Sequence, residues 1–505
     1  MLTLKHIGIS LAITSLCSLT TLSSYANAPS NPRSAADEFA QWRQQTKETF
    51  QQYLDENDRA FIGFLKESWD PVELKRPEQQ NTEPKPVELP KAPVIKVPKV
   101  KEPIANEPNI DSQPQATPTP PLTVPPPKVA ITPLAPSQQP SAEFNFYGYA
   151  IEVPYDTKLI KPAKGSPNSD MIANQWQSMA LSNFQPTVER LLQIQHELQL
   201  SDWAMLQLTA AFSGTLYPRD DNSRSLLSWF LLVKSGYDAR VAFNNSILLL
   251  MPADEPVFGV TYFTLNDKRY YTLNNALQSP DKRPYSSSQA YTYQGQYDAA
   301  RTQMRFIPAD GFMASGEPKV RQLTFTDAGQ EWRVDIPYTD AQIAYLNSLP
   351  QLPLRRYFRA GLPANAKDAL LTQLRPMING QSEVVAVNRL LRFVQTAFAY
   401  QTDEQQFHYE NYLFPLETLY YPYSDCEDRA ALFAWLTETL LNLDVVILDY
   451  PGHVATAVAF TEPAVGSSIN FGGKHYTIAD PTYVNATAGM GMPQYEQVQP
   501  KVEAF

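Results

Sequence analysis

Two patterns of apolar residues follow one another in the C-terminal part of the chain. After Ser424 and Asp425, which are residue types favoured at helix N-termini, apolar side chains recur at helical spacing, as at Phe433 and Leu436. Three short runs rich in β-branched residues follow, and such runs between turn residues are typical of strands. They lie at 444–450, 453–460 and 475–479. The pattern predicts a helix that begins at Cys426 and packs against an antiparallel sheet.

The same order of elements occurs once before in the chain. Residues 143–340 open with a strand-like segment, continue with three helical patterns and end with apolar runs typical of strands. Trp229 and Asp238 in this stretch match Trp435 and Asp444 of the later one. We therefore predict an α+β fold that is duplicated, although an unrelated α+β domain would show a similar order of elements.

The chain before residue 143 has a different composition. Residues 34–70 carry aromatic side chains at roughly helical spacing among charged ones, which predicts amphipathic helices that pack on a domain or dock a protein partner. Residues 71–140 contain 19 of the 44 prolines and neither glycine nor an aromatic residue. Such a segment cannot bury enough apolar surface to fold, and proline keeps it extended. We predict a disordered proline-rich linker, whose proline motifs are a second place for a protein partner.

The first residues have the features of an export signal. One lysine precedes a short apolar run, and small residues follow near Ala26, which predicts a cleaved signal peptide and a periplasmic or secreted protein. The predicted parts of the chain are the signal peptide 1–26, the helical segment 34–70, the linker 71–140, and the domains 143–340 and 341–505.

The composition narrows the range of functions that this chain can have. The net charge is −11 without a long charge run, which argues against nucleic acid as a partner. Of the two cysteines, Cys17 leaves with the signal peptide, so the mature chain keeps Cys426 alone and has no internal disulfide. Five scattered histidines give no metal-ligand spacing, and we predict neither a metal nor a cofactor.

Cys426, His453 and Asp480 are the candidate catalytic residues. Cys426 lies in the first turn of the predicted helix, where backbone N–H groups without partners stabilise a thiolate. If the last two predicted strands pair as an antiparallel hairpin, His453 at the start of one lies beside Asp480 at the end of the other. Asp480 then holds one imidazole tautomer while the other ring nitrogen faces the thiol. This is the arrangement of nucleophile, base and orienting group in covalent catalysis.

At these residues the chain resembles the transglutaminase-like superfamily of papain-like cysteine enzymes, over roughly residues 380–490. The family pattern is a cysteine that opens a helix, a histidine that opens a following strand and an aspartate that ends the next one. The matching motifs are SDCEDRA, PGHVATAV and IADPTY, and Ser424 stands where glycine is commoner. The resemblance implies acyl transfer through a cysteine thioester, either as peptide or amide hydrolysis or as transamidation.

The upstream domain lacks this chemistry. By alignment, residues 220–222 stand near the cysteine position, Phe258 or Gly259 at the histidine position, and Asn274 or Asn275 at the aspartate position. No thiol and no base remain, so the resemblance implies a degenerate transglutaminase-like copy followed by an active one.

Three functions follow from these observations. The leading one is an exported cysteine enzyme that hydrolyses a peptide or amide bond of a peptide or protein, for example in the cell envelope. A catalytically inactive binding or scaffold protein of the envelope also fits the linker, the N-terminal helix and the empty first copy. The third is a protein-crosslinking transglutaminase.

The acidic neighbours of the cysteine receive a structural interpretation. Negative charge raises the pKa of a thiol, so Asp425, Glu427 and Asp428 are predicted to cap the helix or to pair with Arg429.

Four further residues near the motifs complete the predictions. The oxyanion hole is predicted to combine the Cys426 N–H with a donor at Tyr400 or Gln401. His475 is predicted to lie at the surface, and His408 is a candidate for the wall of the cleft.

Overall fold

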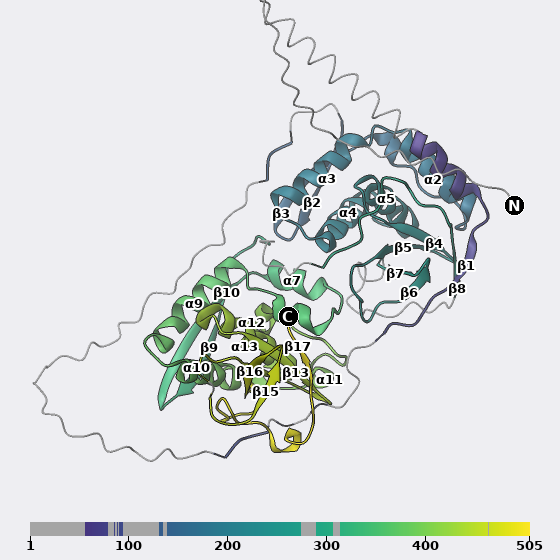
Figure 1. The fold of residues 1–505 in the computed structure, drawn as a ribbon. Helices are drawn as coiled ribbons and strands as arrows, with labels where there is room; N and C mark the ends of the chain where they lie inside the picture. The colour runs from purple at the N-terminus through teal and green to yellow at the C-terminus, as the bar shows by residue number, and fades with distance from the viewer. Residues whose placement is uncertain are drawn as a thin grey trace, which may run out of the picture. The chain divides into compact units, whose positions relative to one another are not determined.

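The computed structural model describes an α+β chain whose sheets of four or more strands are antiparallel (Figure 1). The described residues are 56–78, 85, 88, 90–93, 131–134, 139–273, 289–306, 314–462 and 464–505. The predicted signal peptide lies outside them, as do residues 34–55 and much of the predicted linker. The predicted α+β class is confirmed.

The N-terminal half of the described chain contains a hairpin of β2 (Ser141–Phe146) and β3 (Tyr149–Pro154). Its turn needs Gly148, because φ there is +88° and a Cβ atom would lie 2.1 Å from the carbonyl oxygen of Ser315. A short 3₁₀ turn, η1 (Thr157–Leu159), and four helices follow. These helices are α2 (Ser169–Ala180), α3 (Gln185–Glu197), α4 (Asp202–Leu216) and α5 (Asp221–Lys234).

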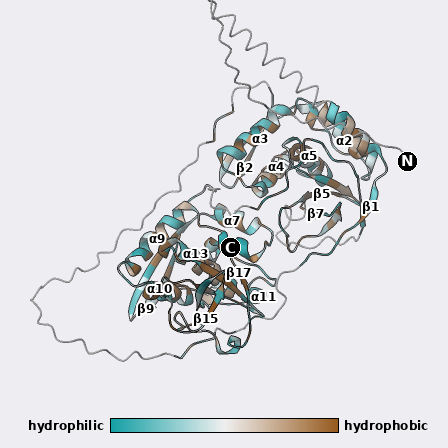
Figure 2. Cartoon of the chain, viewed as in Figure 1, coloured by the Kyte–Doolittle hydropathy of each residue, from teal (hydrophilic) through white to brown (hydrophobic). Residues whose placement is uncertain are grey.

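The helices of this half begin where the sequence offers suitable caps. The side chains of Asn168, Ser201 and Asp220 accept hydrogen bonds from backbone N–H groups in the first turns of α2, α4 and α5, which satisfies donors that a helix leaves without partners. Hydrophilic and hydrophobic residues are interleaved along α2 and α3 (Figure 2), as expected for helices with one buried face.

A six-stranded sheet follows the helices, with the strand order β1-β8-β4-β5-β7-β6. Its strands are β1 (Asp70–Glu73), β4 (Arg240–Phe243), β5 (Ile247–Pro252), β6 (Tyr262–Leu265), β7 (Lys268–Thr272) and β8 (Gln289–Thr292). All of its strand pairs are antiparallel. Strand β5 is buried along its whole length, as its uninterrupted apolar run requires.

The beginning of the predicted linker is part of this sheet. Strand β1 pairs with β8, Lys75 bridges to Tyr262, and the Glu78 carboxylate binds Arg269 at 2.8 Å. The prediction that residues 71–140 are disordered is therefore wrong for residues 71–78. Proline at position 71 does not prevent this, because β1 lies at the edge of the sheet and needs only one row of ladder bonds.

The C-terminal half begins with a hairpin and four helices. The hairpin consists of β9 (Lys319–Asp327) and β10 (Gln330–Tyr338). The helices are α7 (Asp340–Ser348), α8 (Leu354–Arg359), α9 (Ala364–Ile378) and α10 (Glu383–Thr396). Although these residues lie within the predicted domain 143–340, the hairpin packs on later helices: Phe325 contacts Phe393 of α10, and the Gln373 side chain of α9 bonds the backbone of Asp335.

Short elements then lead into the second large sheet. They are β11 (Ala399–Tyr400), α11 (Asp403–Gln406), α12 (Pro415–Tyr420), β12 (Tyr423–Ser424) and α13 (Cys426–Leu441). The sheet itself contains β13 (Val445–Tyr450), β14 (His453–Val458), β15 (Ser468–Phe471), β16 (Lys474–Ala479) and β17 (Lys501–Glu503), with η2 (Pro493–Tyr495) before the last strand.

The order in this sheet is β15-β16-β14-β13-β17, and α13 packs against β13 and β14. The predicted helix and its three strands are confirmed as α13, β13, β14 and β16. The predicted hairpin of the last two strands is wrong in one respect, because the intervening loop contains β15, which forms the true hairpin with β16. Strands β14 and β16 still pair, with Thr456 opposite Ala479.

A helix at residues 56–66 docks into the N-terminal half, which confirms the predicted packing on a domain for this part of the segment 34–70. Phe61 is buried against the rings of Trp176 and Tyr297, at centroid distances of 4.7 and 5.5 Å. The buried ammonium of Lys234 binds Asp58 at 2.5 Å. Among the described helices, none combines the length and the apolarity that crossing a membrane requires.

One hydrophobic core extends through both halves. It includes Phe61 and Trp229 as well as Phe393, Leu432 and Ile447. The predicted division of the chain at residue 340 therefore cuts through shared apolar packing.

We expect Phe61→Ala to lower the free energy of unfolding by about 3–5 kcal/mol, because it leaves a cavity among aromatic rings. Phe64→Ala on the same helix is the matched control, since that side chain is 41% exposed, and its effect should be clearly smaller. Urea denaturation followed by tryptophan fluorescence measures both. Equal losses for the two variants would contradict the docking of this helix.

Candidate functional site

The candidate residues come from three adjoining elements. Cys426 is the first residue of α13, His453 is the first residue of β14, and Asp480 directly follows β16. Helix α13 packs against β14, and β14 pairs with β16. All three side chains are buried, with exposed fractions of 2% or less. The fold therefore brings together elements that are far apart in the sequence.

The predicted proximity of His453 and Asp480 is confirmed. The imidazole Nε2 lies 2.9 Å from Asp480 Oδ2. The other carboxylate oxygen accepts the backbone N–H groups of Thr482 and Tyr483, at 2.8 and 3.2 Å. A carboxylate only accepts hydrogen bonds, so Nε2 carries the proton in this pair and Nδ1 is left with its lone pair.

The ring of His453 is held in place by stacking and by a fixed turn. Tyr495 stacks on it with a centroid distance of 5.2 Å and an angle of 14°. Gln395 of α10 donates from its side-chain amide to the carbonyl oxygens of Asp480, Tyr483 and Ala486, at 2.9 to 3.2 Å. Because Gln395 fixes the turn that carries Asp480, it positions the imidazole indirectly.

The thiol and the imidazole are not hydrogen-bonded to each other in this state. The Cys426 thiol donates to Glu427 Oε2 at 3.1 Å. His453 Nδ1 is buried and has no hydrogen-bond partner among the described residues. A buried nitrogen without a partner costs about 1–3 kcal/mol, which a hydrogen bond from the thiol would relieve.

A cluster of buried carboxylates surrounds the start of α13. Asp403, Asp425, Glu427 and Asp428 are each at most 2% exposed, and Glu410 is partly buried beside them. The ammonium group of Lys85, from the predicted linker, lies among them: it is 2.8 Å from Glu410 Oε1 and 2.9 Å from Asp425 Oδ2, and also pairs with Glu427. The prediction of a disordered linker is therefore also wrong for Lys85.

The predicted capping role of the acidic residues is confirmed in part. Asp428 accepts the backbone N–H of Asp425 at 3.2 Å and that of Leu413 at 2.8 Å. The predicted pairing with Arg429 is wrong. That fully buried guanidinium donates instead to Ser424 Oγ and to the carbonyl oxygens of Gln395, Phe398 and Ala399.

The electrostatics of the site oppose a free thiolate. Burial, followed by the carboxylates of Glu427 and Asp425, raises the pKa of the Cys426 thiol well above its usual value. The prediction that the helix N-terminus stabilises a thiolate is therefore wrong for this state. Burial together with Glu427 raises the pKa of Asp425 to about 7. Burial alone would lower the pKa of Lys85, but Glu427, Asp425 and Asp403 hold it well above its usual value.

The remaining predicted neighbours divide into two groups. Tyr400 lies in β11 beside Ser424 of β12, with the Arg429 guanidinium 5.6 Å from its ring centre. Burial raises the pKa of its hydroxyl. His475 is exposed, as predicted, and His408 is exposed as well.

The acidic cluster also contains sets of oxygen atoms that are close enough to hold a cation. They are Asp403 with Glu410 and Glu427, and Asp403 with Asp425 and Asp428. Oxygen-only sets of this kind suit hard cations such as Ca²⁺. In this structure the ammonium of Lys85 supplies the positive charge to three of these carboxylates.

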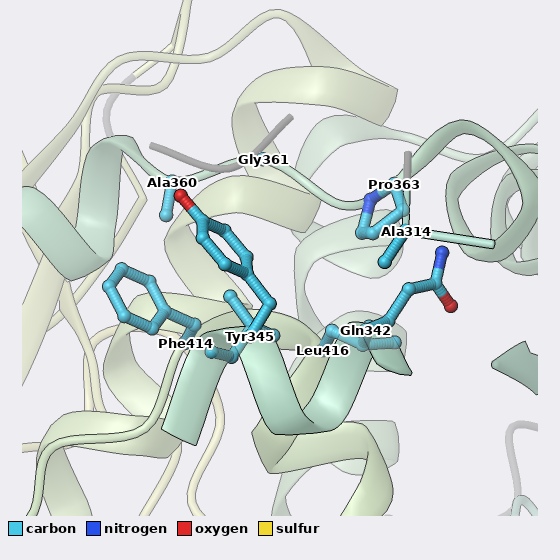
Figure 3. A pocket seen from close by; sticks show the side chains of 9 residues that line it. Ala314, Gln342, Tyr345, Ala360, Gly361, Pro363, Phe414 and Leu416 are labelled. Carbon is cyan, nitrogen blue, oxygen red and sulfur yellow. The ribbon is translucent and has the colours of Figure 1, made fainter. Parts of the chain in front are cut away.

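A small pocket elsewhere in the C-terminal half does not include the candidate residues (Figure 3). Tyr345, Phe414 and Leu416 are among its walls. The Tyr345 hydroxyl already bonds Ser201 at 2.7 Å, and the Gln342 amide bonds Asn365 at 3.2 Å. Its polar groups thus serve the fold, and we assign it no chemistry.

Sequence reasoning missed three residues that shape the site: Lys85, Gln395 and Tyr495. Lys85 lies 340 positions before Asp425 in a composition typical of disorder, so no local pattern marks it. Gln395 is a buried polar residue on the apolar face of α10, and that break in the apolar pattern is a signal that was available. Tyr495 follows no regular pattern.

Comparison with known proteins returned no match: no protein-family model, no curated protein and no solved structure matches this chain. The function is therefore inferred from the geometry of the site and from the motifs.

We expect Glu427→Gln to speed alkylation of Cys426 by iodoacetamide between about pH 7 and 9, because removing a negative charge lowers the thiol pKa. The rates are measured by intact mass. Glu438→Gln is the control, since Glu438 lies on the same helix but is exposed, and it should leave the rates unchanged. An unchanged pH profile in Glu427→Gln would contradict the role of Glu427.

Proposed function

We propose that this protein is an exported cysteine acyl-transfer enzyme of the transglutaminase-like superfamily, which hydrolyses a peptide or amide bond with Cys426, His453 and Asp480. The observation that carries the proposal is the buried His453–Asp480 hydrogen bond of 2.9 Å, on a strand that packs against the helix opened by Cys426. A buried imidazole with one oriented nitrogen and one nitrogen without a partner is what a general base beside a thiol requires.

The proposed mechanism has two halves. In the first, Cys426 Sγ attacks the substrate carbonyl carbon, and the thiol proton passes to Nδ1 of His453. The imidazolium then gives this proton to the leaving amine, the C–N bond breaks, and a thioester remains. In the second half, water gives a proton to His453 and attacks the thioester, which releases the acid and returns the proton to the thiol. Asp480 stabilises the imidazolium in both halves.

This mechanism requires one rearrangement of the site. The thiol now donates to Glu427, so the Cys426 side chain must turn from that carboxylate toward His453. Transfer of the proton to His453 also overcomes the raised thiol pKa, because the thiolate then forms beside an imidazolium instead of free among carboxylates.

The sheet topology supports the proposed duplication. Read from its β6 edge, the first sheet has the order β6-β7-β5-β4-β8-β1, and the second has β15-β16-β14-β13-β17. The first five strands correspond, and β1 is an additional edge strand of the first sheet. Helix α5 precedes β4 and packs against β5, as α13 precedes β13 and packs against β14. We infer two copies of one transglutaminase-like unit, of which only the second carries the three candidate residues.

This correspondence changes the predicted positions in the first copy. Because β5 is the counterpart of β14, Ser246 or Ile247 takes the place of His453, instead of Phe258 or Gly259. The N-cap Asp220 is the counterpart of the N-cap Asp425, so Asp221 takes the place of Cys426. Asn274 and Asn275, predicted at the aspartate position, lie outside the described residues.

A second candidate function is favoured by the resting state of the thiol. Cys426 is fully buried, its pKa is raised and it bonds a carboxylate rather than His453. These properties suit an inactive scaffold or binding protein of the cell envelope, in which the acidic cluster serves only the fold.

The two candidate functions differ in the turnover of a peptide library by the purified protein. We expect Cys426→Ala and His453→Ala each to lower it by at least about a thousandfold, because nucleophile and base act as a unit. Asp480→Asn should also lower it strongly, because the imidazole loses its orientation.

His475→Ala is the control for a histidine outside the site, and it should keep full turnover. Equal turnover by the wild type and Cys426→Ala would exclude catalysis by this thiol and favour the scaffold. Incorporation of a labelled primary amine into a glutamine-containing protein would identify the crosslinking alternative.

A further inference from the structure

The ammonium of Lys85 lies in a pocket of four carboxylates. Its Nζ is 2.8 Å from Glu410, 2.9 Å from Asp425 and 3.7 Å from Asp403, and it also pairs with Glu427. The Lys85 side chain is only 5% exposed. Burial and the neighbouring carboxylates raise the pKa of Asp403, Glu410 and Asp425, so a cation among these groups is strongly favoured.

This pocket adjoins the candidate nucleophile directly. Glu427 is shared between the two groups: one of its oxygens pairs with Lys85, and the other accepts the thiol of Cys426 at 3.1 Å. Lys85 also lies 5.6 Å from the centre of the Tyr412 ring, a contact that favours a cation. Glu427 therefore links a cation in this pocket to the thiol.

The same stretch of chain contacts the other end of the site. The N–H of Ala92 donates to the Val484 carbonyl at 2.8 Å, and the N–H of Val484 donates to the Pro90 carbonyl at 3.1 Å. Ala92 is buried in one apolar cluster with Tyr483. Tyr483 lies in the bend that directly follows Asp480. Backbone pairing of this kind is how extended peptides bind to a protein.

We propose that Asp403, Glu410, Asp425 and Glu427 form a subsite for the lysine side chain of an extended peptide, and that Lys85, anchored by residues 90–92, fills it as a built-in pseudosubstrate. The role of this peptide as a substrate rests on the proposed function, but its binding does not require catalysis.

The geometry favours lysine over other cationic groups. The carboxylates come from three separate parts of the chain, around positions 403, 410 and 425–427, and converge on one point. A compact ammonium with three rotatable donors matches such a convergence, whereas the planar guanidinium of arginine matches two oxygens side by side.

In this structure the chain's own lysine occupies the subsite beside the buried thiol. An occupant tethered in the same chain acts at an effective concentration in about the millimolar range. A peptide from outside must compete with it, so the site opens only when Lys85 and residues 90–92 leave. The chain thus holds its candidate nucleophile covered by a segment that resembles what the site binds.

The first experiment measures binding without catalysis. The probe is a fluorescent peptide of residues 81–95, NTEPKPVELPKAPVI, and binding is followed by anisotropy. Full-length Cys426→Ala/Lys85→Ala should bind it roughly tenfold or more tightly than full-length Cys426→Ala, in which the tethered occupant competes. A control peptide with alanine in place of Lys85 should not bind to either.

Three results would overturn the lysine subsite. The first is no binding of the probe to Cys426→Ala/Lys85→Ala, and the second is equal binding of the control peptide. The third is that calcium chloride raises the melting temperature of this variant while the probe does not, which would assign the four carboxylates to a structural cation. Because both proteins lack the nucleophile, none of these results bears on whether Cys426 is catalytic.

A second variant keeps every charge of the cluster. Ala92→Gln places a larger polar side chain at a position that is 4% exposed and should loosen the anchor, while Lys85 and the carboxylates are unchanged. We expect alkylation of Cys426 to be several-fold faster than in the wild type, and the probe peptide to slow it again. Lys91→Ala, at an exposed neighbouring side chain, should behave as the wild type.

Faster alkylation that the probe peptide does not reverse would mean local unfolding, and an unchanged rate would mean that the segment does not cover the thiol. Either outcome contradicts the pseudosubstrate. Thermal unfolding of each variant, followed by circular dichroism, establishes that the rates refer to folded protein.

Discussion

The start of α13 is buried, and this constraint governs the rest of the site. A helix N-terminus leaves backbone N–H groups that need acceptors, and here Asp428 accepts one of them from within the core. The carboxylates that gather at this point carry negative charge into a buried region, and this charge must be balanced. The chain balances it with Lys85, a residue that is remote in sequence. Helix start, acidic cluster and lysine therefore form one interdependent unit.

The same constraint sets the state of the thiol. A cysteine at an exposed helix N-terminus would lose its proton readily, but Cys426 lies among carboxylates and away from solvent, which raises its pKa. On the proposed mechanism, the thiol is activated only when it meets His453. The imidazole is ready for this role, because Asp480, Gln395 and Tyr495 fix its tautomer and its plane. The site is thus ordered on the side of the base and covered on the side of the nucleophile.

The sheet of the N-terminal half resembles the sheet that carries this site. Five of its six strands follow the same order as the five strands of the second sheet, and a helix packs against β5 in the first and against β14 in the second. On the proposed duplication, Asp221 at the start of α5, which is largely exposed to solvent, takes the place of the buried Cys426. A helix start without buried carboxylates needs no internal cation. The proposed copies would then differ in the charges at the helix start rather than in the framework.

Local patterns were sufficient for the framework of the C-terminal half. The cap Asp425, the apolar spacing after it and the β-branched runs determine α13, β13, β14 and β16, because each depends on residues that are neighbours in sequence. The pairing of β14 with β16 followed from the same patterns, and with it the contact between His453 and Asp480. The strand β15 was missed because its residues are few and partly exposed.

Only the tertiary structure decided the partners and the charge state of the nucleophile. Composition predicted that Lys85 and Ala92 belong to a disordered linker, yet they lie against the acidic cluster and Val484. The physical reason is that burial and ion pairing depend on groups distant in the chain, and no local pattern records them. The sequence by itself determined which residues are candidates for the proposed chemistry. The tertiary structure determined that the thiol is buried and hydrogen-bonded to Glu427.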